Sequence, residues 1–117
     1  MYSQSVLDHF GSPHNAGDLP DATATAEVSN PVCGDVLRLS VRVESGRIVA
    51  VRFKTQGCVA AIAAGSVLTD LLAGKTPVEA RQITPQDVSS ELGGLPPASF
   101  HAAQLCADGV AALMRKL

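Results

Sequence analysis

The feature that most constrains the fold is a pair of segments in which apolar and polar residues alternate. In residues 37–43 the apolar positions are Leu37, Leu39, Val41 and Val43, and in residues 49–54 they are Val49, Val51 and Phe53. A period of two places each apolar set on one face of an extended chain, so both segments are predicted to be strands with one buried face. Ser45, Gly46 and Arg47 fit a three-residue hairpin turn in which Gly46 takes a positive φ.

Matching the two apolar faces predicts the register of this hairpin, because directly opposed residues in a sheet share a face. The matched pairs are Val43 with Val49, Val41 with Val51, and Leu39 with Phe53. The same register, continued outward, places Cys58 opposite Gly34. Gly34 lies between Cys33 and Asp35, so the hairpin is predicted to bring two thiols and a carboxylate to one end of the sheet.

The other segments predict a third strand and several helices. Residues 23–28 alternate like the hairpin strands, and residues 2–10 and 59–73 have helical spacing. Thr76 and Thr84 each precede a proline and are expected to cap short helices, and Ser99 is expected to cap a final helix. The predicted fold is α+β, a three-stranded antiparallel sheet with helices packed on one face, in a single domain of residues 1–117.

Composition limits the classes of function. With 117 residues, 46% of them hydrophobic, the chain can bury one modest core. The net charge is −2 and the basic residues are scattered, which argues against a nucleic-acid partner. The N-terminus lacks signal-peptide features and no apolar run could span a bilayer, so we expect a cytoplasmic protein without a membrane partner. Three cysteines, an odd number, favour reduced thiols over a disulfide framework.

The two loop cysteines and the carboxylate are candidate metal ligands. Cys33, Cys58 and Asp35 would supply two sulfur donors and one oxygen donor, and His101, at the start of the last helix, is the best remaining fourth donor. The same cysteines could be small buried hydrophobic residues, and Asp35 could stabilise a turn. Spacing alone therefore leaves metal binding and simple packing open.

The third cysteine and the two remaining histidines are interpreted as structural residues. On a helical wheel Cys106 lies among apolar residues and opposite His101, so we assign it to the core. His9 and His14 lie at the end of the first helix and in the loop that follows it. An isolated histidine there is more often a surface or hydrogen-bonding residue than a ligand, and both are left out of the predicted site.

Several segments together resemble the IscU/NifU-type iron–sulfur cluster assembly scaffolds. The similar segments are Val6 to Phe10 with Pro13, Asn15 and Gly17; Asn30 to Asp35; Phe53 to Cys58 with Ala61 and Ala63; and Leu95 to Pro97. They cover nearly the whole chain in the order that the family keeps. In that alignment the family's ligand positions are occupied by Cys33, Asp35, Cys58 and His101.

The resemblance implies an IscU-like fold and a scaffold that binds iron and sulfide and passes a nascent cluster, expected to be [2Fe-2S], to acceptor proteins. It also implies a cysteine desulfurase as partner, and a chaperone that recognises Leu95, Pro96 and Pro97. Zinc is a possible occupant of the same four residues in the isolated protein. No catalytic triad, phosphate loop or dinucleotide fingerprint is visible, so we do not expect an enzyme.

Three departures from the family pattern keep alternatives open. Ala102 stands where the family has its third cysteine, Ser99 stands where its proline motif ends in lysine, and Ala64, Gly65 and Ser66 replace a serine run. The first departure removes a thiolate that serves the family as ligand and sulfur acceptor. The alternatives are a zinc-binding sulfur-relay partner of a cysteine desulfurase and a metal-free paralogue that only binds partners.

Overall fold

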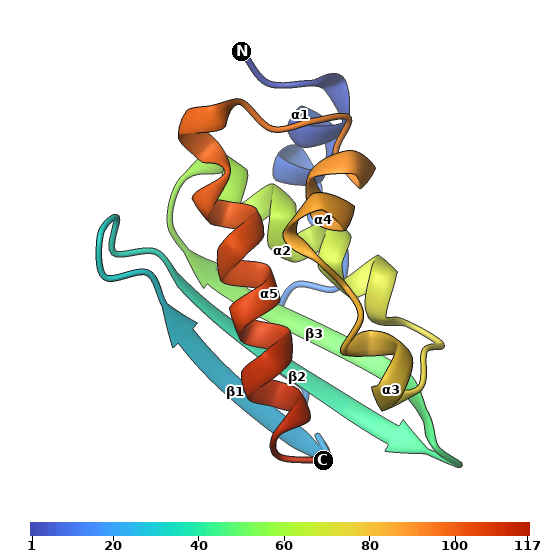
Figure 1. Cartoon of the computed structure of the whole chain (residues 1–117). Coiled ribbons are helices and arrows are strands. Elements are labelled where there is room, and N and C mark those ends of the chain that lie inside the picture. The colour runs from blue at the N-terminus through green and yellow to red at the C-terminus, as the bar shows by residue number, and fades with distance from the viewer.

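The computed structural model describes residues 1–117 and contains a three-stranded antiparallel sheet with helices on one face (Figure 1). The strands lie in the order β1 (Ala24–Ser29), β2 (Val36–Glu44) and β3 (Arg47–Gln56). The helical elements are α1 (Gln4–Gly11), α2 (Val59–Leu72), α3 (Pro77–Ala80), α4 (Pro85–Glu91), the 3-10 helix η1 (Pro97–Ser99) and α5 (His101–Met114). The predicted α+β class and the three-stranded antiparallel sheet are confirmed.

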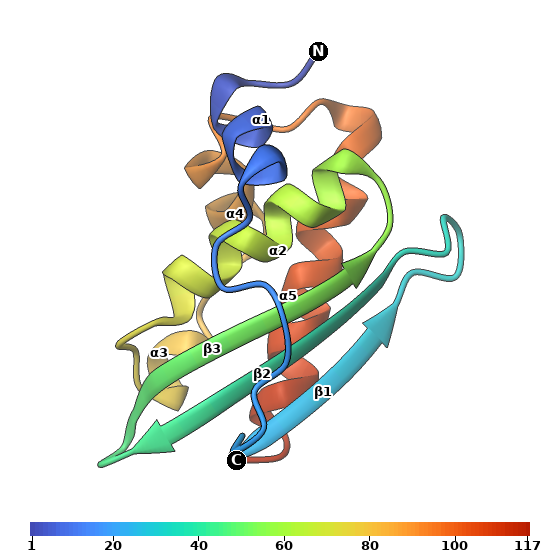
Figure 2. The ribbon, with the colours of Figure 1, turned by 180° about the vertical axis from the view of Figure 1, so that it is seen from behind.

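The two faces of the sheet differ in what covers them. Helices α2 and α5 pack on one face, whereas the other face, seen in Figure 2, is crossed only by the segment that joins α1 to β1. This segment is fastened to the free edge of β3, because Gly17 N–H donates to Phe53 O (2.9 Å) and Phe53 N–H donates to Asn15 O (3.0 Å). The contact covers part of an exposed strand edge and fixes where α1 meets α2.

The predicted hairpin register is correct along most of its length and wrong beside the turn. Leu39 pairs with Phe53 and Val41 with Val51, as expected, but Val43 pairs with Ile48 because the register shifts after Arg42. The turn has two residues, Ser45 and Gly46, both with positive φ (52° and 77°), in place of the predicted three. A two-residue turn of this kind matches the twist of the strands. The shift leaves Val49 half exposed and buries Ile48 instead.

The core lies between the sheet and the helices and contains 26 buried residues. Small residues let the helices approach the sheet closely. At Gly109 on α5, for example, an added Cβ would lie 3.0 Å from Leu37 Cδ2. Cys106 is part of this core, as the helical wheel predicted, and only 1% of its surface is exposed.

The predicted helix caps are correct at two positions and wrong at a third. Thr76 and Thr84 form complete capping boxes with Glu79 and Asp87, and Ser3, which was not predicted, caps α1. The prediction that Ser99 caps the last helix is wrong. It belongs to η1, its hydroxyl lies 3.3 Å from the Tyr2 hydroxyl, and α5 begins without a side-chain cap. The prolines before Ser99 favour a tight turn that takes up this residue before the helix starts.

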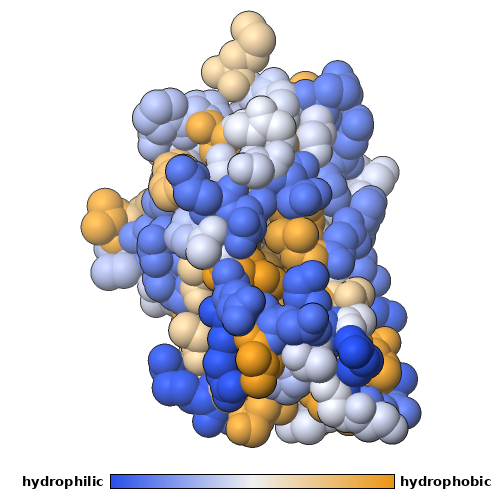
Figure 3. Space-filling view, turned by 45° about the vertical axis from the view of Figure 1, so that its right-hand side comes forward, coloured by the Kyte–Doolittle hydropathy of each residue, from blue (hydrophilic) through white to orange (hydrophobic).

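The face of the molecule seen in Figure 3 is mostly hydrophilic, with separate hydrophobic areas. The exposed large apolar side chains include Val32, at the loop between β1 and β2, and Leu7 and Phe10 on α1. No helix in the structure is both long enough and apolar enough to cross a membrane.

Candidate metal centre

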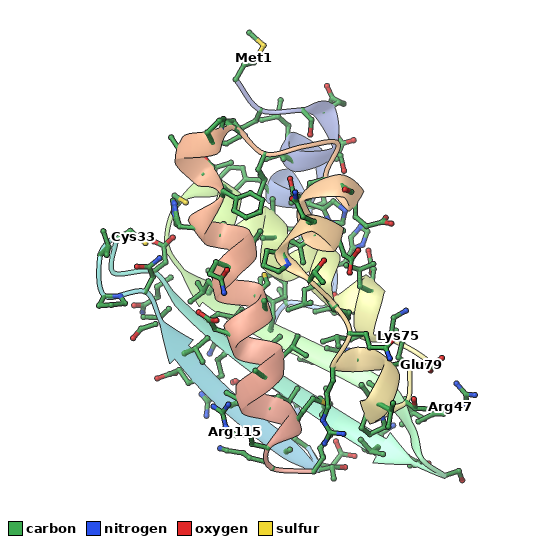
Figure 4. All side chains as sticks on the ribbon, in the orientation of Figure 1. Met1, Cys33, Arg47, Lys75, Glu79 and Arg115 are labelled. Atoms are coloured by element: carbon green, nitrogen blue, oxygen red, sulfur yellow. The ribbon has the colours of Figure 1, made fainter.

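Three separate parts of the chain meet at one end of the sheet. Cys33 lies on the loop between β1 and β2, which projects at the side of the molecule (Figure 4). Asp35 directly precedes β2, Cys58 is the residue before α2, and His101 is the first residue of α5. The structure thus brings together all four residues named from the sequence.

The donor atoms of these residues are close to one another. The Asp35 Oδ2 atom lies 3.6 Å from Cys58 Sγ and 3.4 Å from His101 Nε2, and Cys58 Sγ lies 3.8 Å from His101 Nε2. The ligand atoms of Cys33, Asp35 and His101 are all within 4.8 Å of one another. Two overlapping sets of three donors therefore share Asp35 and His101, and Cys33 completes one set while Cys58 completes the other.

The loop that carries Cys33 is held in shape by Asn30. The Asn30 side-chain oxygen accepts from the backbone N–H of Val32 (2.9 Å) and of Cys33 (3.4 Å). The Asn30 backbone closes the same loop, since its N–H donates to Asp35 O (2.8 Å) and its carbonyl accepts from Gly34 N–H (2.7 Å). Asparagine is suited to such turns because its short side chain can bond to the backbone that follows it.

The orientation of His101 favours metal binding through Nε2. His101 Nδ1 lies 3.1 Å from the Ala98 carbonyl oxygen, which can only accept a hydrogen bond, so the ring proton belongs on Nδ1. In this tautomer Nε2 carries a lone pair that faces Asp35 Oδ2 and Cys58 Sγ. A backbone carbonyl behind the other ring nitrogen is the usual arrangement of a metal-binding histidine.

Asp35 is buried, with 5% of its surface exposed, and it has no lysine or arginine partner among the ion pairs of the structure. A buried carboxylate is costly unless it is paired or hydrogen-bonded, and the neighbours of this one, His101 and Cys58, are themselves metal-binding side chains. Gly57 makes room for this side chain, because a Cβ at residue 57 would lie 2.6 Å from Asp35 Oδ1. The donors therefore suit a cation, and the ligand assignment itself stays a prediction.

Two residues of α5 decide whether the site could have a third sulfur ligand, and both are buried. Ala102, at the position of the family's third cysteine, is fully buried beside His101. Cys106 lies one turn further along the helix, and burial raises the pKa of its thiol to about 12. A thiol with so high a pKa stays protonated at neutral pH, so it is not a ready ligand or nucleophile.

The residues that support these donors were not predicted from the sequence. Asn30, Gly57 and Ala98 shape the site through a side-chain amide, a missing Cβ and a backbone carbonyl. Asn30 could have been found from the known tendency of asparagine to organise turns. Gly57 follows from the hairpin register, which places residue 57 opposite Asp35, whereas a carbonyl contact from Ala98 leaves no signal in the side-chain pattern.

Comparison of the fold with solved structures finds several of the same shape. A NifU-like protein (N-terminal) from Brucella abortus superposes with a TM-score of 0.78 at 20% sequence identity, covering 97% of this chain and 92% of that one. A structure described as a putative iron–sulfur cluster assembly scaffold protein for the SUF system, from Fervidobacterium islandicum, gives a TM-score of 0.75 at 18% identity, covering 97% and 96%. At these identities the likeness concerns the fold.

Comparison of the sequence with curated proteins finds closer relatives. The chain is 44% identical over 110 residues to iron–sulfur cluster assembly scaffold protein IscU 1 of Archaeoglobus fulgidus, covering 94% of this chain and 72% of that protein. It is 41% identical over 119 residues to the scaffold protein IscU of Azotobacter vinelandii, covering 97% and 91%. The model of the NifU-like N terminal domain matches residues 1–116. The protein therefore belongs to the NifU-like N-terminal domain family, which includes the IscU scaffolds.

Proposed function

We propose that this protein is an iron–sulfur cluster assembly scaffold. Iron and sulfide are its cargo, and they combine at Cys33, Asp35, Cys58 and His101 before the cluster passes to an acceptor protein. The observation that carries this function is the convergence of two sulfur donors, one nitrogen and one oxygen at an accessible end of the sheet. Family membership and the scaffold relatives at 41–44% identity support it.

The mixed donor set suits a site that builds a cluster and then releases it. Cysteine thiolates are the usual ligands of iron–sulfur clusters, whereas a carboxylate is a harder and weaker partner for iron in such a site. Asp35 is therefore the ligand that an incoming thiolate of an acceptor would displace most easily. Cys33 and Cys58 are both exposed, so an acceptor can reach the sulfur side of the site.

A zinc site with a role in sulfur relay is the second candidate. Two sulfurs, one nitrogen and one oxygen can form the closed tetrahedron that zinc favours. The Ala98 carbonyl orients the His101 ring, and this orientation suits zinc as well as iron. Cys33 or Cys58 would then leave the metal to accept sulfur from a cysteine desulfurase. A metal-free paralogue that only binds partners is the third candidate, and the convergence of Asp35 with a cysteine and a histidine at one point argues against it.

The expected partners are a cysteine desulfurase and acceptor proteins, with a chaperone at Leu95, Pro96 and Pro97. This last segment joins α4 to η1, and Pro97 is exposed while Leu95 and Pro96 are half-buried. The segment is thus reachable from outside, although Ser99 replaces the lysine of the usual motif. We propose a scaffold and not an enzyme, and we place it in the cytoplasm.

Anaerobic reconstitution with iron and sulfide tests the scaffold function. The wild-type protein should develop visible absorbance typical of a [2Fe-2S] cluster, with iron and sulfide in equal amounts by elemental analysis. Zinc at one equivalent, with no visible absorbance after reconstitution, would favour the sulfur-relay candidate. If the protein binds neither iron nor zinc, the result would favour the metal-free paralogue.

The matched pair for this experiment is Cys58→Ser against Cys106→Ala. Each variant removes one thiol, but only Cys58 lies within reach of Asp35 and His101. Cys58→Ser should lose most of the bound iron, because a neutral hydroxyl does not replace a thiolate as a soft ligand, and Cys106→Ala should keep it. Equal cluster content in wild type and Cys58→Ser would reject the assignment.

A further inference from the structure

A second group of donor side chains lies away from the candidate metal centre. It consists of His9 on α1, His14 in the loop after α1, and Asp70 near the end of α2. Their ligand atoms are all within 4.8 Å of one another, and the two imidazole rings lie 4.5 Å apart at their centroids. The two histidines look isolated in the sequence, but the fold places both beside Asp70.

The group is separate from the first site. Cys58 and Asp70 stand at opposite ends of α2, twelve residues apart, which is about 18 Å along a helix at about 1.5 Å per residue. One ion therefore cannot serve both groups. The second group also contains no sulfur, so the two sites differ in the metals that they prefer.

Two hydrogen bonds orient the imidazole rings. His9 Nδ1 lies 2.6 Å from the hydroxyl oxygen of the buried Ser66, and His14 Nδ1 lies 2.7 Å from Asp70 Oδ2. The Nε2 atom of neither ring has a partner among the hydrogen bonds of the protein. Because Asp70 is bonded to His14 Nδ1, an ion that all three side chains share would lie at Nδ1 of His14 and replace the proton between these two atoms.

The loop that carries His14 is fixed on α2 by further contacts. The His14 backbone N–H donates to Ser66 Oγ (2.7 Å), and the Asn15 side-chain amide donates to Thr69 Oγ1 (3.0 Å). Thr69 in turn donates to the Ser66 carbonyl at 2.7 Å. Because Asp70 belongs to α2 and the loop of His14 is bonded to α2, these residues need little further ordering when an ion binds.

We propose that His9, His14 and Asp70 form a second metal site, which binds a divalent first-row transition ion such as Zn²⁺. Two imidazoles and one carboxylate suit these ions and leave positions for water, whereas soft Cu(I) and iron–sulfur clusters prefer sulfur. The side chains of His14 and Asp70 are 52% and 44% exposed, so the ion can enter from solvent and exchange. This site does not depend on the proposed scaffold function.

Zinc titration by calorimetry tests the second site in a background that lacks the first. In the double variant Cys33→Ser, Cys58→Ser, the protein should still bind one equivalent of Zn²⁺. Adding Asp70→Asn, or separately His14→Gln, should weaken this binding by roughly tenfold or more, since each removes a direct ligand. Both positions are exposed, and circular dichroism checks that the fold is kept.

The matched control is Asp8→Asn in the same background. Asp8 is an exposed carboxylate next to His9, and its contact is with the Gln4 side chain. This variant removes the same charge as Asp70→Asn but no ligand, so its Zn²⁺ affinity should match the background. No Zn²⁺ bound in the background, or equal weakening in the Asp8 and Asp70 variants, would overturn the proposal. The three residues would then be a hydrogen-bonded contact between α1 and α2.

Discussion

Gly57→Ala is the substitution that best tests the geometry of the candidate metal centre. Residue 57 has no direct contact with a donor atom, but its missing Cβ leaves the space that the Asp35 carboxylate fills. The added methyl group would lie 2.6 Å from Asp35 Oδ1 and 2.7 Å from Asp35 Cγ. Gly57 is not among the glycines with positive φ, so the backbone accepts alanine and only the side-chain contact changes.

The size of the effect follows from this overlap. An ordinary contact begins at 3.4 Å, so the carboxylate must move by about 0.8 Å. Metal–ligand distances tolerate changes of only about 0.2 Å, so Asp35 would leave its ligand position. We expect metal affinity to fall by about 10- to 100-fold, the usual range for losing a residue that positions a ligand, which is about 1.4–2.7 kcal/mol. Overpacking should cost the fold about 1–3 kcal/mol at most.

The assay is competition for Zn²⁺ against a chromophoric chelator under anaerobic, reducing conditions, with Asp70→Asn present in every protein compared so that the second proposed site does not contribute. Gly11→Ala is the matched control, because it makes the same chemical change at a glycine with no atom within 4 Å of the new Cβ. The control should bind zinc like the wild type. If Gly57→Ala also binds zinc with wild-type affinity while circular dichroism shows an intact fold, the inferred contact between residue 57 and a metal-binding Asp35 is wrong.

Three further substitutions test other parts of the structure. Asp35→Ala should slow cluster transfer to an acceptor while assembly continues, because it removes the most exchangeable ligand; faster transfer, followed by absorbance of the acceptor, would contradict this. Cys106→Ala should lower the free energy of unfolding by about 1 kcal/mol in denaturant titration and keep the metal. With a thiol pKa of about 12, Cys106 should also resist alkylation at pH 8 while Cys33 and Cys58 react, and three alkylated cysteines in the folded protein would refute its burial. Ala102→Cys should lengthen the lifetime of a reconstituted cluster against a chelator, at a modest cost in stability because residue 102 is fully buried; unchanged decay with an intact fold would mean that residue 102 only packs.

The sequence predicted the sheet because each strand has one clear apolar face. The pairing of Leu39 with Phe53 is enough to fix the register at the end of the hairpin that carries the two cysteine loops. The same register places Cys58 in contact with Asp35. The pattern fails near the turn, where Ile48 and Val49 are both apolar and either could face the core. The two-residue turn decides between them, and it buries Ile48.

Contacts between helices and loops were harder to predict than strand pairs. Periodicity gives the buried face of one helix but not which residues of another element lie beside it. The clustering of His9 and His14 on Asp70 depends on where α1 docks, and α1 is positioned by contacts such as those of Ser66 and Asn15. The Ser99 cap was wrong for a related reason, since the turn of η1 and the Tyr2 hydroxyl use this residue first.

The order of the four donors along the chain has a consequence for the newly made protein. During translation Cys33, Asp35 and Cys58 leave the ribosome first, and His101 follows 43 residues after Cys58. At synthesis rates of about 5–20 residues per second, the nascent chain exposes an incomplete donor set for about 2–9 seconds. The hairpin can form in that interval, but on the proposed ligand set full coordination would wait until α5 has been made and has docked on the sheet. Loading would then be coupled to the last folding step, and a truncated or unfinished chain would hold its cargo with sulfur and oxygen alone.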